Sequence, residues 1–149
     1  VDGRFSATFP SIDEWLDPVI SGGPCVPGPT TLCIDNNPGD KRFKVEIVYD
    51  SVLNGGISGS GRAIALNGIG IPKGGLFWFF TSDNPEVMVK VINGCGSNGK
   101  FWLFYSAATT LGMTTTISDT IGSNPPVVIV NPDLNAAAPV ATITAFNCP

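Results

Sequence analysis

Residues 76–106, LFWFFTSDNPEVMVKVINGCGSNGKFWLFYS, carry the strongest structural pattern in the chain. Residues 76–81 and 100–106 are apolar at consecutive positions, which predicts central strands that are covered on both faces. Residues 86–92 lie between them and predict a further strand. Residues 93–99 contain two Asn-Gly pairs, which tolerate the positive φ that hairpin turns require. The stretch therefore predicts consecutive strands of an antiparallel sheet.

Shorter β-rich segments flank this stretch on both sides. They are residues 41–50, 62–67, 113–118, 127–130 and 140–146. Turn residues separate the segments at spacings of roughly 8–14 residues, a rhythm typical of an antiparallel sandwich or barrel. Residues 51–61 carry four glycines and are expected to form a mobile loop. The expected fold is an all-β, antiparallel β-sandwich of about eight strands.

The chain contains four cysteines, Cys25, Cys33, Cys95 and Cys148. An even number in a small, glycine-rich, acidic chain predicts two disulfides and an oxidising compartment, with buried free thiols as the alternative. Three pairings are possible, and we favour Cys25–Cys148 with Cys33–Cys95. Each would close a loop of more than 60 residues, worth on the order of 4 kcal/mol. A zinc site is disfavoured because the chain has no histidine and no Cys-x-x-Cys pair.

Residues 1–24 form an extension ahead of a domain predicted at residues 25–149. Residues 1–9, VDGRFSATF, alternate between apolar or small and polar side chains, which predicts a half-buried strand. Its apolar side carries Val1, Phe5, Ala7 and Phe9. Residues 11–14 match a capping box and predict one helical turn, and the Pro- and Gly-rich residues 18–30 predict a linker. Val1 at the start fits either a secreted precursor that has lost its signal peptide or a trimmed chain.

The charge pattern argues against several classes of partner. Eight basic and twelve acidic residues give a net charge of -4, and the basic residues form no cluster in the sequence. Binding to nucleic acid requires clustered Lys and Arg, so it is not expected, and neither is binding to anionic membranes. No apolar run approaches the roughly 20 residues that a membrane-spanning helix needs.

The residues needed for common catalytic mechanisms are largely missing. The chain has no histidine and no Gly-x-Ser-x-Gly motif. Its only glutamates, Glu14, Glu46 and Glu86, fit a helix cap, the solvent face of a strand and a turn. Residues 35–40, DNNPGD, have only a superficial likeness to a calcium loop, and a polar turn is favoured. We therefore expect no enzymatic activity, no cofactor and no metal.

Aromatic residues provide the one pattern that could indicate ligand binding. Eight of them gather in two of the predicted strands: Phe77, Trp78, Phe79, Phe80, Phe101, Trp102, Phe104 and Tyr105. Packing in a core on both sheet faces is the favoured interpretation. If one face were open, Trp78 and Trp102 would be candidates for stacking on sugar rings or on a protein partner.

A series of short motifs runs in a distinctive order from residue 25 to the last residue. They are TTLC (30–33), RFKV (42–45), FWFF (77–80), DNPE (83–86), VKV (89–91), NGC (93–95), NGKFW (98–102), SDT (118–120) and FNCP (146–149). In this order and cysteine placement the chain resembles a four-cysteine β-domain family of secreted bacterial proteins. Members look like C-terminal modules of larger extracellular proteins. The resemblance implies a fold and a compartment but no activity, and in this chain residues 35–40 form a longer turn than the pattern has.

These observations lead to one functional hypothesis and an alternative. We expect an extracellular structural protein that assembles into a filament or surface polymer, because a detached amphipathic strand can join the sheet of a neighbouring subunit. Burying its apolar side would contribute roughly 5–8 kcal/mol before ordering costs. Residues 1–9 could instead fold back on their own sheet. The alternative function is a monomeric adhesive or carbohydrate-binding module that uses exposed aromatics, with glycans or a cell-surface protein as partners. An inhibitor or accessory domain of a secreted enzyme has no positive support.

Overall fold

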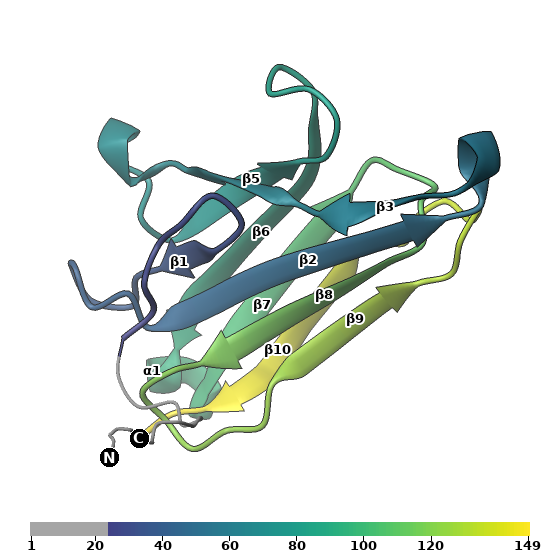
Figure 1. The fold of residues 1–149 in the computed structure, drawn as a ribbon. Helices are drawn as coiled ribbons and strands as arrows, with labels where there is room; N and C mark the ends of the chain where they lie inside the picture. Colours follow the sequence, from purple (N-terminus) through teal and green to yellow (C-terminus); the bar gives the residue numbers. More distant parts are fainter. Residues whose placement is uncertain (1–23) are drawn as a thin grey trace, which may run out of the picture.

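A computed structural model of the chain describes residues 24–149. Within these residues, ten strands form two five-stranded antiparallel sheets that pack face to face (Figure 1). The predicted all-β sandwich is confirmed, with two strands more than the eight expected. The predicted strand at residues 1–9 and the predicted helical turn at residues 11–14 lie outside the described residues. Within residues 24–149, no helix combines the length and apolar character needed to cross a membrane.

The first sheet is built around its longest strand, and we call it the β2 sheet. It contains β1 (Leu32–Ile34), β2 (Phe43–Ser51), β8 (Met113–Asp119) and β9 (Val127–Asn131) in that spatial order, with β3 (Ile57–Ser60) beside β2. The first part of β2 pairs with β1 and its last part with β3, while β8 pairs along the opposite side of β2. The strand β9 therefore ends this sheet.

The second sheet, the β7 sheet, contains the aromatic strands. Its spatial order is β10 (Val140–Asn147), β7 (Lys100–Ala107), β6 (Pro85–Gly94), β5 (Gly74–Trp78) and β4 (Arg62–Ala65). The predicted hairpin at residues 93–99 is confirmed, because β6 pairs with β7 across it. Its loop is a single helical turn, α1 (Cys95–Asn98), which ends at Gly99 with a φ of 73°. That left-handed conformation explains a glycine at this position.

The glycine-rich stretch predicted to be a mobile loop is largely ordered structure, so that prediction was wrong. A short turn at Leu53–Gly55 leads into β3, which pairs with the last part of β2. Gly61 then carries the chain across to β4 in the other sheet, and its amide donates to the Ile47 carbonyl at 2.8 Å. A Cβ at Gly61 would lie 3.1 Å from the Phe79 ring and 3.2 Å from Ile47. Glycine is needed here because the backbone crosses directly over the core.

The core lies between the two sheets and takes alternate residues from nearly every strand. Its fully buried large side chains are Leu32, Ile34, Phe43, Val45, Ile47, Phe77, Val89, Val91, Phe101, Leu103, Ile117 and Phe146. The ring of Phe43 links the sheets, because its centroid lies 5.1 Å from that of Phe101 and 5.4 Å from that of Phe146. Each such side chain contributes roughly 1.5–3 kcal/mol when fully buried. The core therefore provides the main stabilisation of the sandwich.

Both disulfides are present, but the pairing predicted from the sequence was wrong. The bonds join Cys25 to Cys33 and Cys95 to Cys148, with Cα–Cα distances of 5.8 and 5.9 Å. Cys25 and Cys33 flank a tight turn that is closed by a Gly28–Thr31 bridge. Cys148 follows β10, whose pairing with β7 brings it beside α1. Two disulfides are consistent with an extracellular protein.

Candidate functional site

The outward side of the β7 sheet is unusually apolar. Along β5, β6 and β7 the inward positions hold buried residues such as Phe77, Val89 and Leu103. The opposite positions, which we call the aromatic face, hold Ile64, Leu76, Trp78, Met88, Ile92, Trp102 and Phe104, with Arg62 and Lys90 among them. Apolar side chains gathered on one sheet face are typical of an interaction surface.

The sequence predicts that residues 76–81 and 100–106 are covered on both faces. Within residues 24–149 this prediction is wrong for their outward face. Met88 is 47% exposed, and the two tryptophans are only half-buried. Cationic side chains lie near two of the rings. The Arg62 guanidinium lies 5.6 Å from the Trp78 ring centre, and Lys90 Nζ lies 5.2 Å from that of Phe104. Such cation–π contacts each contribute about 0.5–1 kcal/mol at exposed sites.

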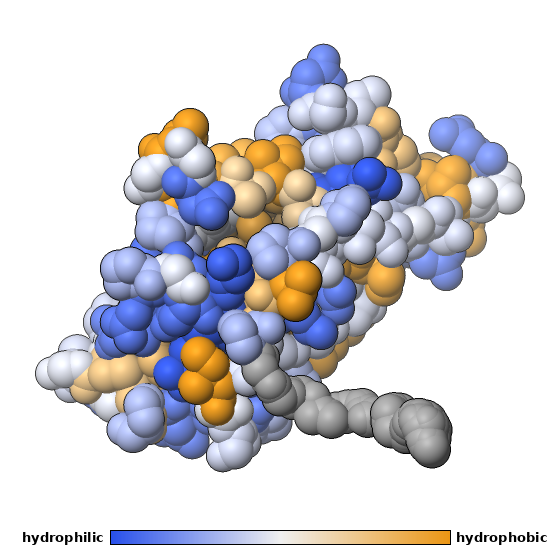
Figure 2. All heavy atoms as spheres, turned by 60° about the vertical axis from the view of Figure 1, so that its left-hand side comes forward, coloured by the Kyte–Doolittle hydropathy of each residue, from blue (hydrophilic) through white to orange (hydrophobic). Residues whose placement is uncertain are grey.

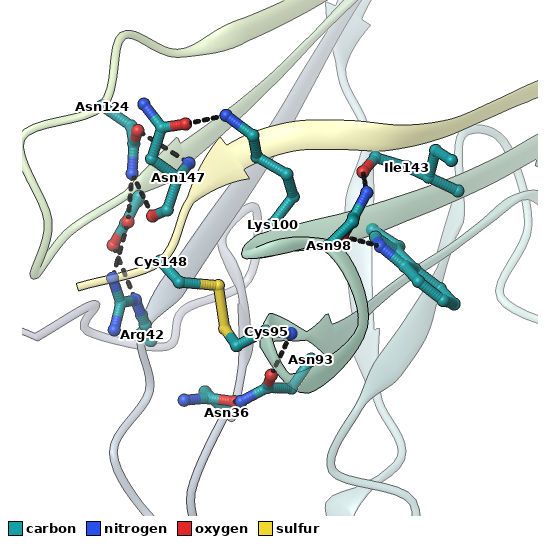
Figure 3. Close-up of a disulfide and its surroundings, with 12 residues drawn as sticks. Asn36, Arg42, Asn93, Cys95, Asn98, Lys100, Asn124, Ile143, Asn147 and Cys148 are labelled. Atoms are coloured by element: carbon teal, nitrogen blue, oxygen red, sulfur yellow. Dashed lines mark hydrogen bonds and ion pairs between the residues drawn. A yellow bond between two sulfur atoms is a disulfide. The ribbon is translucent and has the colours of Figure 1, made fainter.

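Trp102 is held in a fixed orientation on this face. Its Nε1–H donates to Asn98 Oδ1 at 2.9 Å, and the Asn98 amide nitrogen donates to the Ile143 carbonyl at 2.8 Å (Figure 3). A Cβ added at Gly94 would overlap the Trp102 indole. The ring therefore lies against the backbone of Gly94, and the residue is only partly exposed.

The two candidate tryptophans do not form one site. Trp78 pairs in register with Pro85 of β6, whereas Trp102 pairs with Ile92 of the same strand. At about 3.3 Å per residue, these partners are roughly 23 Å apart along β6. Leu76, Met88 and Phe104 lie between them, so the structure shows a continuous apolar surface instead of a paired stacking site.

Gly94→Ala tests the fixed position of Trp102. We expect a loss of about 1–3 kcal/mol in the free energy of unfolding, because the new methyl group displaces the indole and also lies 2.8 Å from the Lys100 carbonyl oxygen. Urea denaturation and the tryptophan emission maximum are the measurements. Gly96→Ala is the matched control, since nothing lies within 4 Å of a Cβ at that glycine. Equal stability and emission in both variants would contradict the packing described.

A second surface lies where the two sheets end, and we call it the β9–β10 opening. The strand β9 is the edge of the β2 sheet and β10 is the edge of the β7 sheet, on the same side of the sandwich (Figure 1), and no strand pairing joins them. Val127, Ile129, Val140 and Ala145 are partly buried here and pack against the core. A recess of about 230 Å³ lies at the end of the opening where β9 leads into the segment before β10, and it reaches inward to Tyr105 and Met113. Burial raises the pKa of Tyr105, whose hydroxyl lies 2.9 Å from Thr115 Oγ1.

Side-chain amides mark both ends of the opening. At one end Asn124 Nδ2 donates to the Asn147 carbonyl at 3.1 Å, and the Asn147 amide donates to Asn124 Oδ1 at 2.9 Å (Figure 3). At the other end Asn131 Nδ2 donates to the carbonyls of Leu111 and Asn135, each at 2.9 Å. These contacts hold the segments that bound the opening, while the edges of β9 and β10 between them share no hydrogen bond among the described residues.

The edge strand β9 lacks the usual protection against pairing with another chain. It reads VVIVN, has no charged residue and no bulge, and exposes Val128 and Val130 by 54% and 65%. The opposite edges differ, because β1 has only three residues and β4 begins at Arg62. In addition, the Ala63 amide of β4 donates to the Pro29 carbonyl at 2.9 Å. An uncharged apolar edge strand is a typical site of strand addition.

Residues 35–40 form a polar turn, as favoured from the sequence. Asp35 accepts hydrogen bonds from the amides of Gly39 and Lys41, and Asp40 accepts from those of Asn36 and Asn37, all at 2.9 Å. On the face that Figure 2 shows, hydrophilic and neutral residues make up most of the surface, and apolar residues form several separate patches. Within residues 24–149 no group of three or more potential protein ligands could hold a metal ion.

The sequence prediction identified β9 as a strand but missed its position at an edge. Pro125 and Pro126 precede it and Pro132 follows it, and proline beside a strand favours an edge position. Val1, Phe5, Ala7 and Phe9, predicted to join a neighbouring subunit, lie outside the described residues.

Comparisons with protein-family models, curated proteins and solved structures found no match to the chain.

Proposed function

We propose that this protein is a secreted, extracellular structural subunit that polymerises by strand addition. Residues 1–9 of one copy occupy the β9–β10 opening of the next copy. The observation that carries the proposal is β9 itself, an uncharged apolar edge strand that faces β10 with no hydrogen bond between them. A strand placed there supplies main-chain partners to an edge and covers apolar side chains, which is the physical basis of recognition by strand addition.

The chemistry of residues 1–9 matches the opening. Their apolar side carries Phe5 and Phe9, and the opening presents Ile129 and Val140 from its two borders. The recess of about 230 Å³ near Tyr105 is larger than the roughly 150 Å³ cavity that accepts a benzene ring. One phenylalanine ring therefore fits, while the polar residues of the strand face solvent.

The contact leads to a filament because donor and acceptor are different surfaces. Such a heterologous contact does not need to close into a ring, so each added copy presents a new opening. The two disulfides suit an oxidising, extracellular location. The competing arrangement is a strand that occupies the opening of its own copy, and assembly that depends on concentration distinguishes the two.

Phe5→Asp is expected to raise the concentration needed for assembly about a hundredfold. Removing a buried phenylalanine costs close to 3 kcal/mol, and each 1.4 kcal/mol corresponds to a factor of ten. Negative-stain microscopy and size exclusion at a series of concentrations provide the measurement.

Ile69→Asp is the matched control, because this apolar side chain is 73% exposed in a turn away from the opening. A variant lacking residues 1–10 provides the monomer reference. If the parent chain stays monomeric at every concentration, or if Phe5→Asp assembles like the parent, strand addition is not the function.

A further inference from the structure

We infer that the aromatic face binds residues 11–20 of the copy that donates its residues 1–9. The inference rests on the proposed function and extends it, because it gives the same neighbouring copy a second contact. The face is apolar and carries Arg62 and Lys90, Met88 on it is 47% exposed, and no strand of the described residues packs over it. A partner for this surface therefore needs apolar side chains and negative charge.

Residues 11–20 have that composition. They read SIDEWLDPVI and carry Asp13, Glu14 and Asp17 without any basic residue. Residues 1–23 as a whole hold four acidic side chains and one basic one, whereas residues 24–149 hold seven basic and eight acidic ones. The excess of negative charge is thus concentrated ahead of the sandwich, and the cations of the aromatic face provide a complement.

The apolar residues of the same segment fit the rest of the face. Half of residues 11–20 are large apolar side chains: Ile12, Trp15, Leu16, Val19 and Ile20. Trp15 is a suitable partner for the exposed part of Trp102, since offset and edge-to-face aromatic pairs add about 0.5–1.5 kcal/mol to the burial of area. An acidic segment with this many apolar residues is not a typical solvated linker.

The distances allow one neighbouring copy to make both contacts. A strand in the opening lies next to β10, which is followed by β7 and then by β6 with Lys90. Three strand spacings of about 4.8 Å place that added strand roughly 14 Å from Lys90. Glu14 follows Phe9 by five residues. With the predicted helical turn at residues 11–14 these five residues span about 12 Å, and the long side chains of Glu14 and Lys90 bridge the remaining distance. The acidic side chains can therefore reach Lys90 without releasing the donated strand.

Zero-length crosslinking of mixed filaments tests the contact directly. Full chains labelled with ¹⁴N and ¹⁵N are assembled together, treated with a carbodiimide and analysed by mass spectrometry. We expect Lys90 to form amide crosslinks with Asp13, Glu14 or Asp17 that join a light copy to a heavy one. Crosslinks found only within one isotope would overturn the inference while leaving the filament, and so the proposed function, intact.

Charge reversal provides an independent measurement. Lys90→Glu is expected to raise the concentration needed for assembly about fivefold, and adding Glu14→Lys is expected to restore it. Lys44→Glu is the matched control, because Lys44 is an exposed lysine on the outward side of the other sheet. Equal assembly of Lys90→Glu and the parent would overturn the inference. It would also be overturned if filaments of the parent bind a glucan oligosaccharide and filaments of Trp102→Ala do not. Absence of filaments from the parent would overturn the proposed function as well.

Discussion

Asp119→Ala is expected to lower the free energy of unfolding by about 3–5 kcal/mol, which is the range for breaking a buried ion pair. The side chains of Arg42 and Asp119 are 7% and 0% exposed, and two hydrogen bonds of 2.9 Å join them. The Arg42 guanidinium also lies 4.7 Å from the centre of the Phe101 ring. Without the carboxylate, this buried cation has no compensating charge.

Asp119 also organises the turn that bounds the β9–β10 opening. It accepts hydrogen bonds from the amides of Ile121 and Gly122, at 3.1 and 2.9 Å, and from Asn124 Nδ2 at 3.0 Å. Asn124 in turn binds the backbone of Asn147 at the end of β10 (Figure 3). The alanine variant should therefore lose assembly competence at temperatures where the parent still assembles.

Asp119 is also expected to make the stability of the fold decrease at low pH. Burial by itself would raise the pKa of Asp119, but hydrogen bonds from Arg42, Gly122, Asn124 and Ile121 together hold the pKa below its ordinary value of 3.8. A carboxylate whose pKa is lower in the folded than in the unfolded protein stabilises the fold. This stabilisation is complete when the pH is above the unfolded-state pKa, and it is lost as the pH falls through the folded-state pKa. The parent should lose this contribution below about pH 4.

Urea denaturation at pH 7 and pH 3 provides the measurement. Between pH 7 and pH 3, the free energy of unfolding should fall less in Asp119→Ala than in the parent. The control is Asp50→Ala, at an exposed position of β2, whose free energy of unfolding at pH 7 should stay within about 0.5 kcal/mol of that of the parent. The double variant Arg42→Met with Asp119→Ala should be more stable than Asp119→Ala alone, because it removes the unpaired charge. A loss below 1 kcal/mol in Asp119→Ala would show that water or another group compensates Arg42.

Local sequence patterns predicted most of the strands, but they predicted less well how the strands pair and what covers them. The alternation in residues 41–50 is observed in β2, where Phe43, Val45 and Ile47 are buried. The short pairing of β3 was missed, because glycine-rich residues have no side-chain alternation to indicate a strand. Their strand character depends on the close approach of Gly59 and Gly61 to residues distant in sequence, which no local pattern contains.

The site was less predictable for a related reason. Residues that are apolar on both faces of a strand indicate two buried faces, but they do not show whether the same chain or a partner covers the second face. Trp78 and Trp102 were therefore identified as candidates without their surroundings. The position of Trp102 depends on Gly94 across the strand pair and on Asn98 in the hairpin loop, and both follow from register.

The disulfide pairing failed because loop length is no guide to proximity. The predicted pairs were chosen without knowing which strands are neighbours. Cys148 meets Cys95 since β10 pairs with β7 and its last residues run beside α1, where the Cys148 amide donates to the Gly99 carbonyl at 3.0 Å. Cys25 meets Cys33 across a local turn. The fold thus determines a pairing that composition alone leaves open among three possibilities.

With the observed pairing, the two disulfides are expected to contribute unequally to the free energy of unfolding. Replacing Cys95 and Cys148 by alanine is expected to lower the free energy of unfolding by about 4 kcal/mol, against about 2.5 kcal/mol for Cys25 and Cys33. The difference follows from the separations of 53 and 8 residues that the bonds span, because a longer loop loses more entropy when it is closed in the unfolded chain. Thermal and urea unfolding of the two double variants measure it.

The long bond also matters for the proposed assembly. Cys148 anchors the end of β10, the strand that forms one border of the opening, to the loop between β6 and β7 (Figure 3). Loss of this bond should free the end of β10 and weaken the acceptor, whereas loss of Cys25–Cys33 leaves both borders in place. We therefore expect the Cys95/Cys148 variant to lose filaments at a temperature where the Cys25/Cys33 variant keeps them. The reverse order, in stability or in assembly, would show that the turn at Cys25 controls the sandwich and that the β10 border does not.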